Sequence, residues 1–346
     1  MKHFILFLGF IFLFLFVSHV NKNQSLLTGD QKPVIKVFAY SSFTSKWGPG
    51  PQLKTLFEQK CNCIIEFVEG SDSGILLQRL KVEGQKLGAD LVVGFDQFDL
   101  QKATVEMSWR ALDFSKIDAD AQIKAAMKNE YFVPYDWGVL SFVARKSSGI
   151  STTLSLDDLL QTQFASKIAL QDPRTSSVGL QFLMWVLKVK GEEEGFEYIR
   201  KMMKQAHSYS PSWSTAYGLF KSEQVDIVLS YVTSPLFHSI EEKNTDFVAL
   251  EMIEPQPLQV EFVGIPSFCG NCEKAEEFIN LMMSSEGQKI LMEKNYMLPV
   301  LKNVRAGTPF ESVKVPFRLL EIEFPSLSQV ESVLEKWSTI RREASL

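Results

Sequence analysis

IALQDPRTSSVG, residues 168–179, constrains the fold of this chain more than any other stretch. It starts with an apolar run at 168–170, passes through Asp172 and Pro173, and leads into an apolar segment that ends near Lys190. Asp and Pro favour a turn, and the Thr and Ser residues that follow are good helix N-caps, so the pattern predicts a strand, a turn and a helix start. Unpaired N–H groups and hydroxyls at such a helix start can bind an anion. An ordinary capped helix has the same residues, so both interpretations stay open.

The N-terminal third shows the same alternation. The predicted strands and helices are, in chain order, residues 34–40, 51–60, 64–68, 75–86 and 89–95. A βαβαβ order indicates a parallel α/β sheet, and ligands of such sheets lie at the carboxyl ends of the strands. Those ends are residues 40–43, 69–73 and 94–96.

A second α/β unit follows. Its predicted strands are residues 138–144, 168–170, 225–231 and 258–265, and its predicted helices are residues 155–160, 181–188, 195–204 and 273–283. Polar and aromatic residues gather at strand ends in both halves. We therefore expect two α/β lobes with a ligand cleft between them.

The composition is that of a globular protein with a substantial core. The chain has 346 residues, a length sufficient for two domains. Of these residues 45% are hydrophobic and 22% are charged. The net charge is −5 and no basic block occurs. This argues against nucleic acid or an anionic membrane surface as the main partner, and it suits a cationic small molecule.

The N-terminus is typical of an exported protein. A short basic start, residues 1–3, precedes an apolar run over residues 4–17, which is too short to span a bilayer comfortably. Residues 18–20 form a poor cleavage site, so an uncleaved anchor stays open. We predict a signal peptide over residues 1–25 and a periplasmic location.

Four cysteines form two close pairs, Cys61 with Cys63 and Cys269 with Cys272. In an oxidising compartment an even count favours disulfides, and three pairings are possible. Cys269 and Cys272 would bridge easily across a Gly-Asn turn, whereas Cys61 and Cys63 would form a tight loop. A zinc ion held by four thiolates is the alternative.

Catalytic motifs are scarce. Outside the predicted signal segment the only histidines are His207 and His238, and neither has a metal-ligand spacing. A nucleophile elbow, a P-loop and a dinucleotide-binding glycine motif do not occur. We therefore predict no catalytic residues, no metal and no cofactor. Trp185 and Tyr217 are assigned to the core, whereas aromatic rings near strand ends are candidates for binding a cation.

The chain resembles the thiamine-binding periplasmic proteins of ABC transporters. The resemblance covers residues 34–301 and rests on ordered stretches: YSSF at 40–43, WGPGP at 47–51, CNC at 61–63, ADLVVG at 89–94, FVPYD at 132–136, QDPRTS at 171–176, WS at 213–214, AYGLF at 216–220, LSY at 229–231, TSP at 233–235 and NYM at 295–297. It implies an α/β, two-lobe periplasmic-binding-protein fold of type II, with mixed, mostly parallel sheets and a hinge. Lobe 1 would comprise residues 31–136 and 262–346, and lobe 2 residues 137–261.

The resemblance also implies a function. The protein would be a monomer that captures thiamine, thiamine monophosphate or thiamine diphosphate in the cleft and delivers it to a membrane permease and ATPase. The ligand contacts that it implies are Tyr40, Asp72, Ser73, Ser176, Ser177, Trp213, Tyr231, Val232, Thr233, Ser234 and Tyr296. Hydroxyls and N–H groups suit a phosphate or alcohol end, aromatic faces suit the thiazolium cation, and the Asp72 carboxylate suits the aminopyrimidine.

Four positions depart from the family pattern. Ser41 replaces an Asp, Phe237 replaces a Tyr, Tyr296 replaces a Trp, and Ser212 replaces a Gly. The alternatives are therefore a binding protein for ferric iron or a polyamine, or an enzyme that degrades thiamine with a cysteine nucleophile. All four cysteines are paired closely in sequence, and Cys61 and Cys63 precede a strand, which places them away from the cleft.

Overall fold

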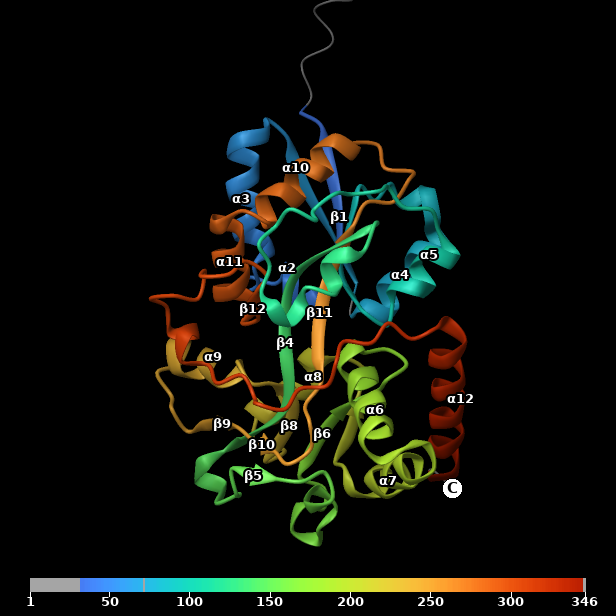
Figure 1. Ribbon diagram of the computed structural model, residues 1–346, viewed down its shortest axis with the longest axis vertical. Helices are drawn as coiled ribbons and strands as arrows, with labels where there is room; N and C mark the ends of the chain where they lie inside the picture. The colour runs from blue at the N-terminus through green and yellow to red at the C-terminus, as the bar shows by residue number, and fades with distance from the viewer. Residues whose placement is uncertain (1–31, 71, 345–346) are drawn as a thin grey trace, which may run out of the picture.

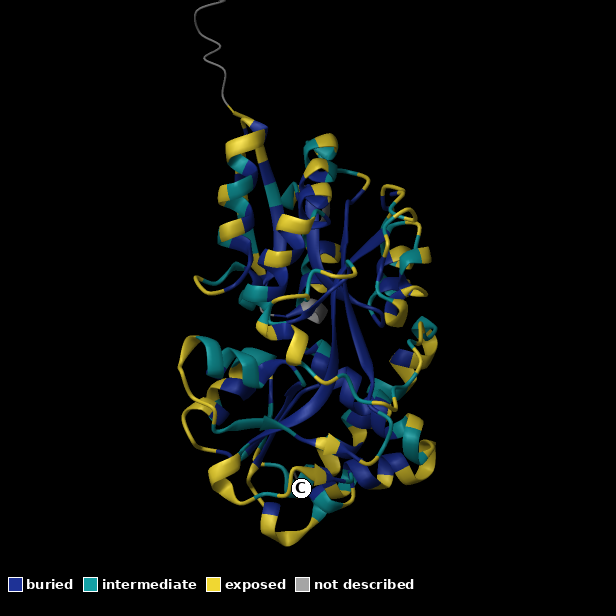
Figure 2. Cartoon of the chain, turned by 60° about the vertical axis from the view of Figure 1, so that its left-hand side comes forward, coloured by how far each residue is buried: buried dark blue, intermediate teal, exposed yellow. Residues whose placement is uncertain are grey.

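Two α/β lobes lie one above the other and are joined by two long strands (Figure 1). The computed structural model describes residues 32–70 and 72–344. The predicted signal peptide over residues 1–25 lies outside this range. Figure 2 shows buried strands running through the middle of both lobes, with the exposed residues on the outer faces of the helices.

The upper lobe contains the N-terminal βαβαβ unit that the sequence predicts. Strand β1 is parallel to both of its neighbours, and all six residues of β3 are buried, as expected for a strand with helices on both faces. Its elements are β1 (Val34–Tyr40), α2 (Ser41–Thr44), α3 (Gly50–Cys61), β2 (Ile64–Gly70), α4 (Ser73–Glu83), η1 (Gly84–Leu87), β3 (Leu91–Asp96), α5 (Leu100–Glu106), η2 (Ala121–Ile123), η3 (Ala126–Lys128), α10 (Cys272–Met282), α11 (Ser285–Asn295), β12 (Leu298–Pro299) and η7 (Pro309–Ser312).

The lower lobe contains the second α/β unit. Its elements, with the two strands shared between the lobes, are β4 (Phe132–Arg145), η4 (Lys146–Ser148), β5 (Thr153–Leu154), η5 (Asp158–Leu160), η6 (Thr162–Phe164), β6 (Ile168–Gln171), α6 (Ser177–Lys190), α7 (Glu192–Gln205), β7 (Ser208–Ser210), α8 (Trp213–Lys221), β8 (Ile227–Tyr231), α9 (Ser234–Glu241), β9 (Phe247–Ala249), β10 (Glu251–Met252), β11 (Leu258–Gly264) and α12 (Leu327–Ala344). The helix predicted at residues 155–160 is a short 3-10 helix that starts at Asp158.

Strand β4 connects the lobes. It has 14 residues and pairs with β11 in the upper half and with β8 in the lower half. The sequence predicts only residues 138–144 as this strand, whereas the structure begins it at Phe132, ahead of Pro134, a residue type that is rare inside strands. Pro134 is tolerated because it faces Phe262, next to a shift in the β4–β11 register.

The sheet is mixed. Strands β8, β9, β11 and β12 all run antiparallel to β4, so parallel pairing is confined to the outer strands of each lobe. One path of hydrogen-bonded strands, β2-β1-β3-β11-β4-β8-β6-β7, runs through both lobes.

Two large apolar clusters match the two lobes. The first draws on residues 35–139 and 258–300, and the second mainly on residues 140–252. The C-terminal tail departs from the expected division: Trp337 and Ile340 of α12 belong to the second cluster. The assignment of residues 262–346 to lobe 1 is therefore wrong for α12, which packs against α7. Its apolar residues alone do not indicate which lobe they will cover.

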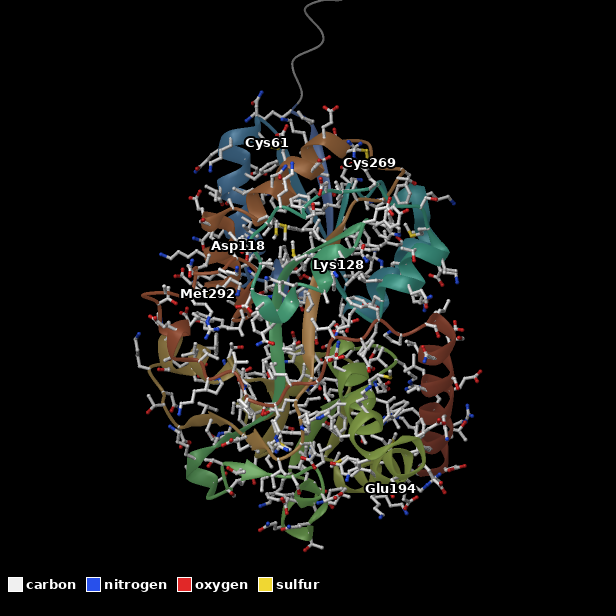
Figure 3. All side chains as sticks on the ribbon, in the orientation of Figure 1. Cys61, Asp118, Lys128, Glu194, Cys269 and Met292 are labelled. Atoms are coloured by element: carbon white, nitrogen blue, oxygen red, sulfur yellow. A yellow bond between two sulfur atoms is a disulfide. The ribbon has the colours of Figure 1, made fainter. Side chains whose placement is uncertain are left out.

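The cysteines form the two local disulfides, Cys61–Cys63 and Cys269–Cys272. Helix α3 ends at Cys61, and Asn62 adopts a left-handed conformation (φ 50°) that brings the Cα atoms of Cys61 and Cys63 to 5.2 Å. Because all four sulfurs are paired, a zinc site of four thiolates is ruled out. Cys61 and Cys269 lie at the end of the upper lobe that faces away from the lower lobe (Figure 3).

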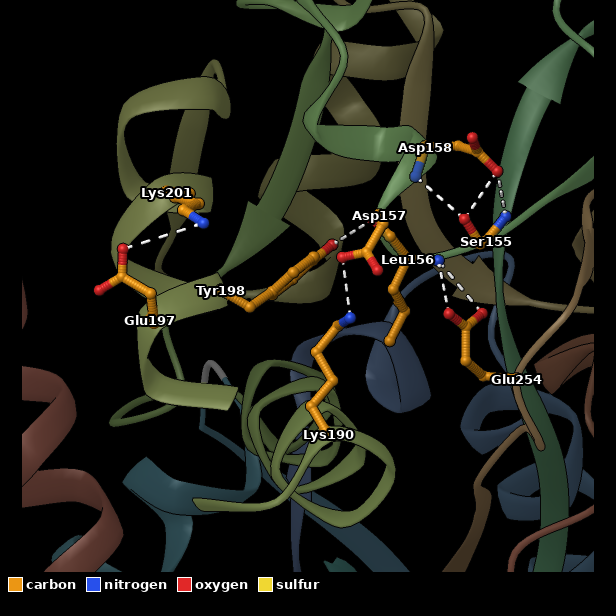
Figure 4. Close-up of polar contacts among 9 residues, drawn as sticks. All are labelled: Ser155, Leu156, Asp157, Asp158, Lys190, Glu197, Tyr198, Lys201 and Glu254. Carbon is orange, nitrogen blue, oxygen red and sulfur yellow. Dashed lines mark hydrogen bonds and ion pairs between the residues drawn. The ribbon is translucent and has the colours of Figure 1, made fainter. Parts of the chain in front are cut away.

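Polar contacts fasten the loop after β5 to α6 and α7 (Figure 4). The Tyr198 hydroxyl donates to the Leu156 carbonyl (2.9 Å), and the Leu156 N–H donates to Glu254 (3.0 Å). Lys190, the last residue of α6, binds Asp157 at 2.8 Å. These contacts hold the far end of α6, the helix whose start faces the other lobe.

Candidate functional site

A cavity of about 630 Å³ lies between the lobes. Aromatic rings from both lobes line it: Tyr40, Trp47, Trp213, Tyr217, Tyr231, Phe237 and Tyr296. The charged residues that line it are Lys46, Asp72, Lys221, Glu241, Glu261 and Lys294. Its volume lies within the range of about 300–1,000 Å³ that is typical of small-molecule sites.

The upper wall is a hydrogen-bond network centred on Glu261 of β11. Its Oε2 atom accepts hydrogen bonds from the hydroxyls of Tyr40 (2.8 Å) and Tyr135 (2.7 Å). Asn295, the last residue of α11, donates from Nδ2 to the Tyr40 hydroxyl (2.9 Å) and to Asp136 (2.7 Å). The network thus joins β1, β4, β11 and α11 at the roof of the cavity.

The lower wall is formed by a stack of rings. Trp213 stacks on Tyr217 with ring centroids 4.7 Å apart, and its indole N–H donates to the Ser230 hydroxyl (2.9 Å). The Tyr217 hydroxyl lies 2.9 Å from Nε2 of His238, whose Nδ1 lies 2.6 Å from Glu242. Burial lowers the pKa of His238, so its imidazole is neutral at pH 7 and its Nε2 atom can accept a hydrogen bond from the Tyr217 hydroxyl. This chain of contacts fixes the face that Trp213 presents.

The start of α6 also faces the cavity, where Ser177 and Val178 line it. Ser176 is the N-cap residue, but its side chain makes no capping hydrogen bond. Its Oγ atom is buried and has no hydrogen-bond partner in the described part of the chain. The first N–H groups of a helix have no intrahelical acceptor, so the helix start is a place where an anionic or hydroxyl group can be held.

Asp72 links the two lobes across the cavity. It lies at the end of β2, and its Oδ2 atom accepts a hydrogen bond from the backbone N–H of Trp213 (3.4 Å). A carboxylate that already touches the opposite lobe is well placed to hold a ligand between the lobes.

Most of the predicted contact residues meet at this cavity: Tyr40, Asp72, Ser177, Trp213, Tyr231, Ser234 and Tyr296 all line it. Ser176 and Thr233 are buried beside it, and Val232 is half-buried; none of these three is among the residues that line the cavity in the described structure. Ser73 is the first residue of α4, and its side chain lies outside the described part of the chain.

Several lining residues are not among the predicted contacts. Glu261 is one, although a Glu inside the apolar run 258–264 is a signal that sequence can reveal. Trp47 belongs to a stretch that carries the family resemblance, and it is 48% exposed, which marks it as unusual. Tyr217 is buried, as predicted, but it also reaches the cavity beneath Trp213. Asn295 also belongs to a stretch that carries the family resemblance, NYM at 295–297.

Comparison with known proteins identifies the family. The model of the bacterial extracellular solute-binding proteins matches residues 52–315. The chain belongs to this family. The thiamine-binding periplasmic protein of Salmonella typhimurium is 36% identical to this solute-binding protein over 307 residues, which are 88% of this chain and 91% of that protein. A solved periplasmic thiamin binding protein matches with a TM-score of 0.81 at 32% identity, over 90% of this chain and 98% of that one.

The fold is shared more widely than the sequence. The apo ferric ion-binding protein A of Pasteurella haemolytica has a TM-score of 0.71 at 12% identity, over 90% of this chain and 98% of that one. These neighbours confirm the expected two-lobe periplasmic-binding-protein fold for this solute-binding protein. None of the helices in residues 32–70 and 72–344 combines the length and apolar character needed to span a bilayer.

Gly94 tests how closely Tyr40 must be packed. It has a φ of +110°, and a Cβ atom added there would lie 2.2 Å from Cδ1 of Tyr40. We predict that Gly94→Ala lowers the free energy of unfolding by about 1–3 kcal/mol more than Gly149→Ala does, because the added methyl group overpacks the Tyr40 ring. Urea unfolding of both variants measures the difference.

Gly149 is the matched control. It also has a positive φ (+70°), but an added Cβ would meet no heavy atom within 4 Å in the described structure. Gly149→Ala therefore reports backbone strain alone. Equal losses in the two variants would contradict the packing argument.

Proposed function

We propose that this solute-binding protein captures thiamine and its phosphate esters in the periplasm and delivers them to the permease and ATPase of an ABC transporter. The observation that carries the proposal is the lining of the cavity: aromatic faces from both lobes, with the carboxylates of Asp72 and Glu261, enclose a space of ligand size. Aromatic faces attract cations, and the attraction strengthens when water is excluded. Thiamine contains a permanently cationic ring.

The two ends of the cavity suit the two ends of such a ligand. The start of α6 at Ser177 suits the alcohol or phosphate end, because helix N–H groups and the helix dipole favour an anion. Asp72 suits the amino group of the pyrimidine, because a carboxylate accepts its hydrogen bonds. The similarity to thiamine-binding periplasmic proteins supports the same assignment.

The departures from the family pattern keep the aromatic character of the site. Phe237 and Tyr296 pack edge to face with centroids 5.3 Å apart, and both line the cavity. The Tyr296 hydroxyl donates to Glu241 at 3.0 Å. At the position of the third departure, Ser41 lies in α2, and the carboxylates that reach the cavity come from other elements. We propose that the ligand is unchanged by these substitutions.

The rival functions have less support. Ferric iron needs a cluster of hard oxygen ligands, and the described residues contain no group of three or more His, Cys, Asp or Glu side chains that could hold a metal ion. A cysteine nucleophile is also unsupported, because the disulfides Cys61–Cys63 and Cys269–Cys272 use every cysteine. We propose that the protein works as a monomeric binding protein and not as an enzyme.

The identity of the ligand can be tested through the thermal stability of the protein. Thiamine, thiamine monophosphate and thiamine diphosphate should each stabilise the protein against heat, because a ligand that binds only the folded state adds about 2.7 kcal/mol at 100 times its dissociation constant. Thermal unfolding and calorimetry with each compound measure this. A shift with ferric iron or spermidine and none with the thiamine compounds would reject the proposal.

Trp213 is expected to contact the cationic ring of the ligand. Trp213→Ala should weaken thiamine binding by about 1–2 kcal/mol, since it removes the aromatic face that a desolvated cation contacts. Trp213→Phe keeps a ring above Tyr217 and should lose less. Calorimetry of both variants gives the comparison, and an unchanged dissociation constant in the Ala variant would remove Trp213 from the site.

The start of α6 is expected to hold the phosphate group of the esters. Ser177→Ala should weaken binding of the two phosphate esters more than binding of free thiamine, because Ser177 lines the cavity at the end suited to an anion. Ser176→Ala tests the neighbouring hydroxyl, which is buried and has no hydrogen-bond partner in the described part of the chain, and should show the same preference if that hydroxyl also reaches the anion. Equal losses for esters and free thiamine in Ser177→Ala would refute the anion-site role.

A further inference from the structure

Two acidic side chains lie side by side in the roof of the cavity. Asp136 of β4 and Glu261 of β11 are direct partners in the antiparallel register, and Asn295 Nδ2 contacts both carboxyl groups, at 2.7 Å and 3.3 Å. Asp136 is completely buried, and Glu261 is 9% exposed. Two buried carboxyl groups in contact cannot both ionise at low cost, so the pair holds one proton and one negative charge.

The surrounding donors place the negative charge on Glu261. Its Oε2 atom accepts from Tyr40 and Tyr135, with Asn295 Nδ2 at 3.3 Å, and Gln259 Nε2 lies 3.4 Å from Oε1. Asp136 accepts from Asn295 at Oδ2, and its Oδ1 atom is buried without a donor in the described part of the chain. Donors to an ionised carboxylate stabilise the charge, so Asp136 carries the proton.

Glu261 faces the cavity, and in the described part of the chain it has no ion-pair partner. Glu261 lines the cavity, whereas Asp136 lies behind it. Three lysines line the cavity. Lys221 pairs with Glu242 at 2.6 Å and Lys294 with Glu241 at 3.8 Å, whereas Lys46 comes from the loop after α2 and forms no ion pair with Glu261. Within the described chain, no lysine or arginine forms an ion pair with Asp136 or Glu261.

We propose that Glu261 is the counter-ion for the positive charge of the ligand, and that Asp136 holds the proton of the pair so that the negative charge stays on Glu261. The inference rests on the proposed function, in which the cation is the thiazolium ring. It assigns the recognition of charge to a carboxylate in the roof of the cavity, in addition to the aromatic faces below.

Both acids titrate above their ordinary range. Burial raises the pKa of Asp136, and the neighbouring Glu261 raises it further. Burial also raises the pKa of Glu261, although hydrogen bonds from Tyr135 and Tyr40 oppose this. The other titratable groups near the pair are Tyr231, whose pKa burial raises, and the acids whose charges act on it, Asp72 and Asp96. Because these pKa values are raised, the pair takes up its second proton at a higher pH than an exposed carboxylate does.

The affinity for a cationic ligand should depend on the pH. Above the raised pKa the pair carries one negative charge and binds the cation. As the pH falls through that pKa the pair becomes neutral and the cation loses its counter-ion. Affinity for a cation should therefore fall on acidification, whereas affinity for an uncharged molecule of the same shape should not.

The experiment compares thiamine with a neutral isostere in which carbon replaces the thiazolium nitrogen. The isostere keeps the aminopyrimidine, so protonation of that ring is matched. Dissociation constants are measured by calorimetry at intervals from about pH 5 to pH 8, above the usual carboxyl pKa of about 4. For the wild-type protein, thiamine binding should weaken towards pH 5 by more than isostere binding.

Two variants test the two roles. Glu261→Gln should bind thiamine about tenfold more weakly at pH 8, since it removes a unit charge near the ligand, and should bind the isostere as the wild type does. Asp136→Asn replaces the protonated acid by a neutral amide, so Glu261 should keep its charge and the acid limb for thiamine should stay where it is in the wild type; an acid limb displaced by this variant would show that Asp136 is ionised. Thermal unfolding without ligand checks that each variant is folded.

The outcomes separate the inference from the function on which it rests. Failure of the wild-type protein to bind thiamine at pH 8 refutes the proposed function. Thiamine binding with equal acid limbs for thiamine and the isostere refutes the counter-ion role, and so does a folded Glu261→Gln variant with unchanged discrimination between them. If a variant does not fold, the comparison of the two ligands on the wild-type protein still decides.

Discussion

The structure depends on one strand that belongs to both lobes. Over its 14 residues β4 pairs with β11 above and β8 below, and all but the last residue are buried. Because β4 forms backbone hydrogen bonds with strands of both lobes, the lobes cannot separate without breaking the strand. Each lobe nevertheless keeps its own apolar cluster. The same strand carries Asp136 to the roof of the cavity, so the connection between the lobes and the binding chemistry are built from one element.

The cavity combines two kinds of attraction for a cation. The lower wall offers the face of Trp213, held by stacking on Tyr217 and by the hydrogen bond to Ser230. The upper wall offers Glu261, held by the hydroxyls of Tyr40 and Tyr135. Both groups are fixed by neighbours that come from other strands and helices, so little reorganisation is needed when a ligand enters. A fixed charge in a partly dry space acts more strongly than one in water.

Local patterns predicted the elements well. The stretch 168–179 indicated a strand, a turn and a helix start, and the structure has β6 ending at Gln171 and α6 beginning at Ser177. Turn residues and caps act over a few positions, so they are visible in sequence. The first six residues of β4 were missed, since a stretch that contains Pro134 has a weak local strand signal. The place of α12 was missed because an amphipathic helix does not specify what it covers. In both cases the structure was determined by contacts with a strand or lobe that lies far away in the sequence.

By itself, the sequence determined the α/β class, the two lobes, and the aromatic and acidic residues at strand ends, because periodicity, turn chemistry and family motifs are written in neighbouring residues. Only the tertiary structure decided that Glu261 and Asp136, 125 positions apart, are neighbours on adjacent strands, that Asn295 joins them, and that Ser177 rather than Ser176 lines the cavity. Such contacts depend on strand register and on how two lobes meet, and neither leaves a local trace in the order of residues.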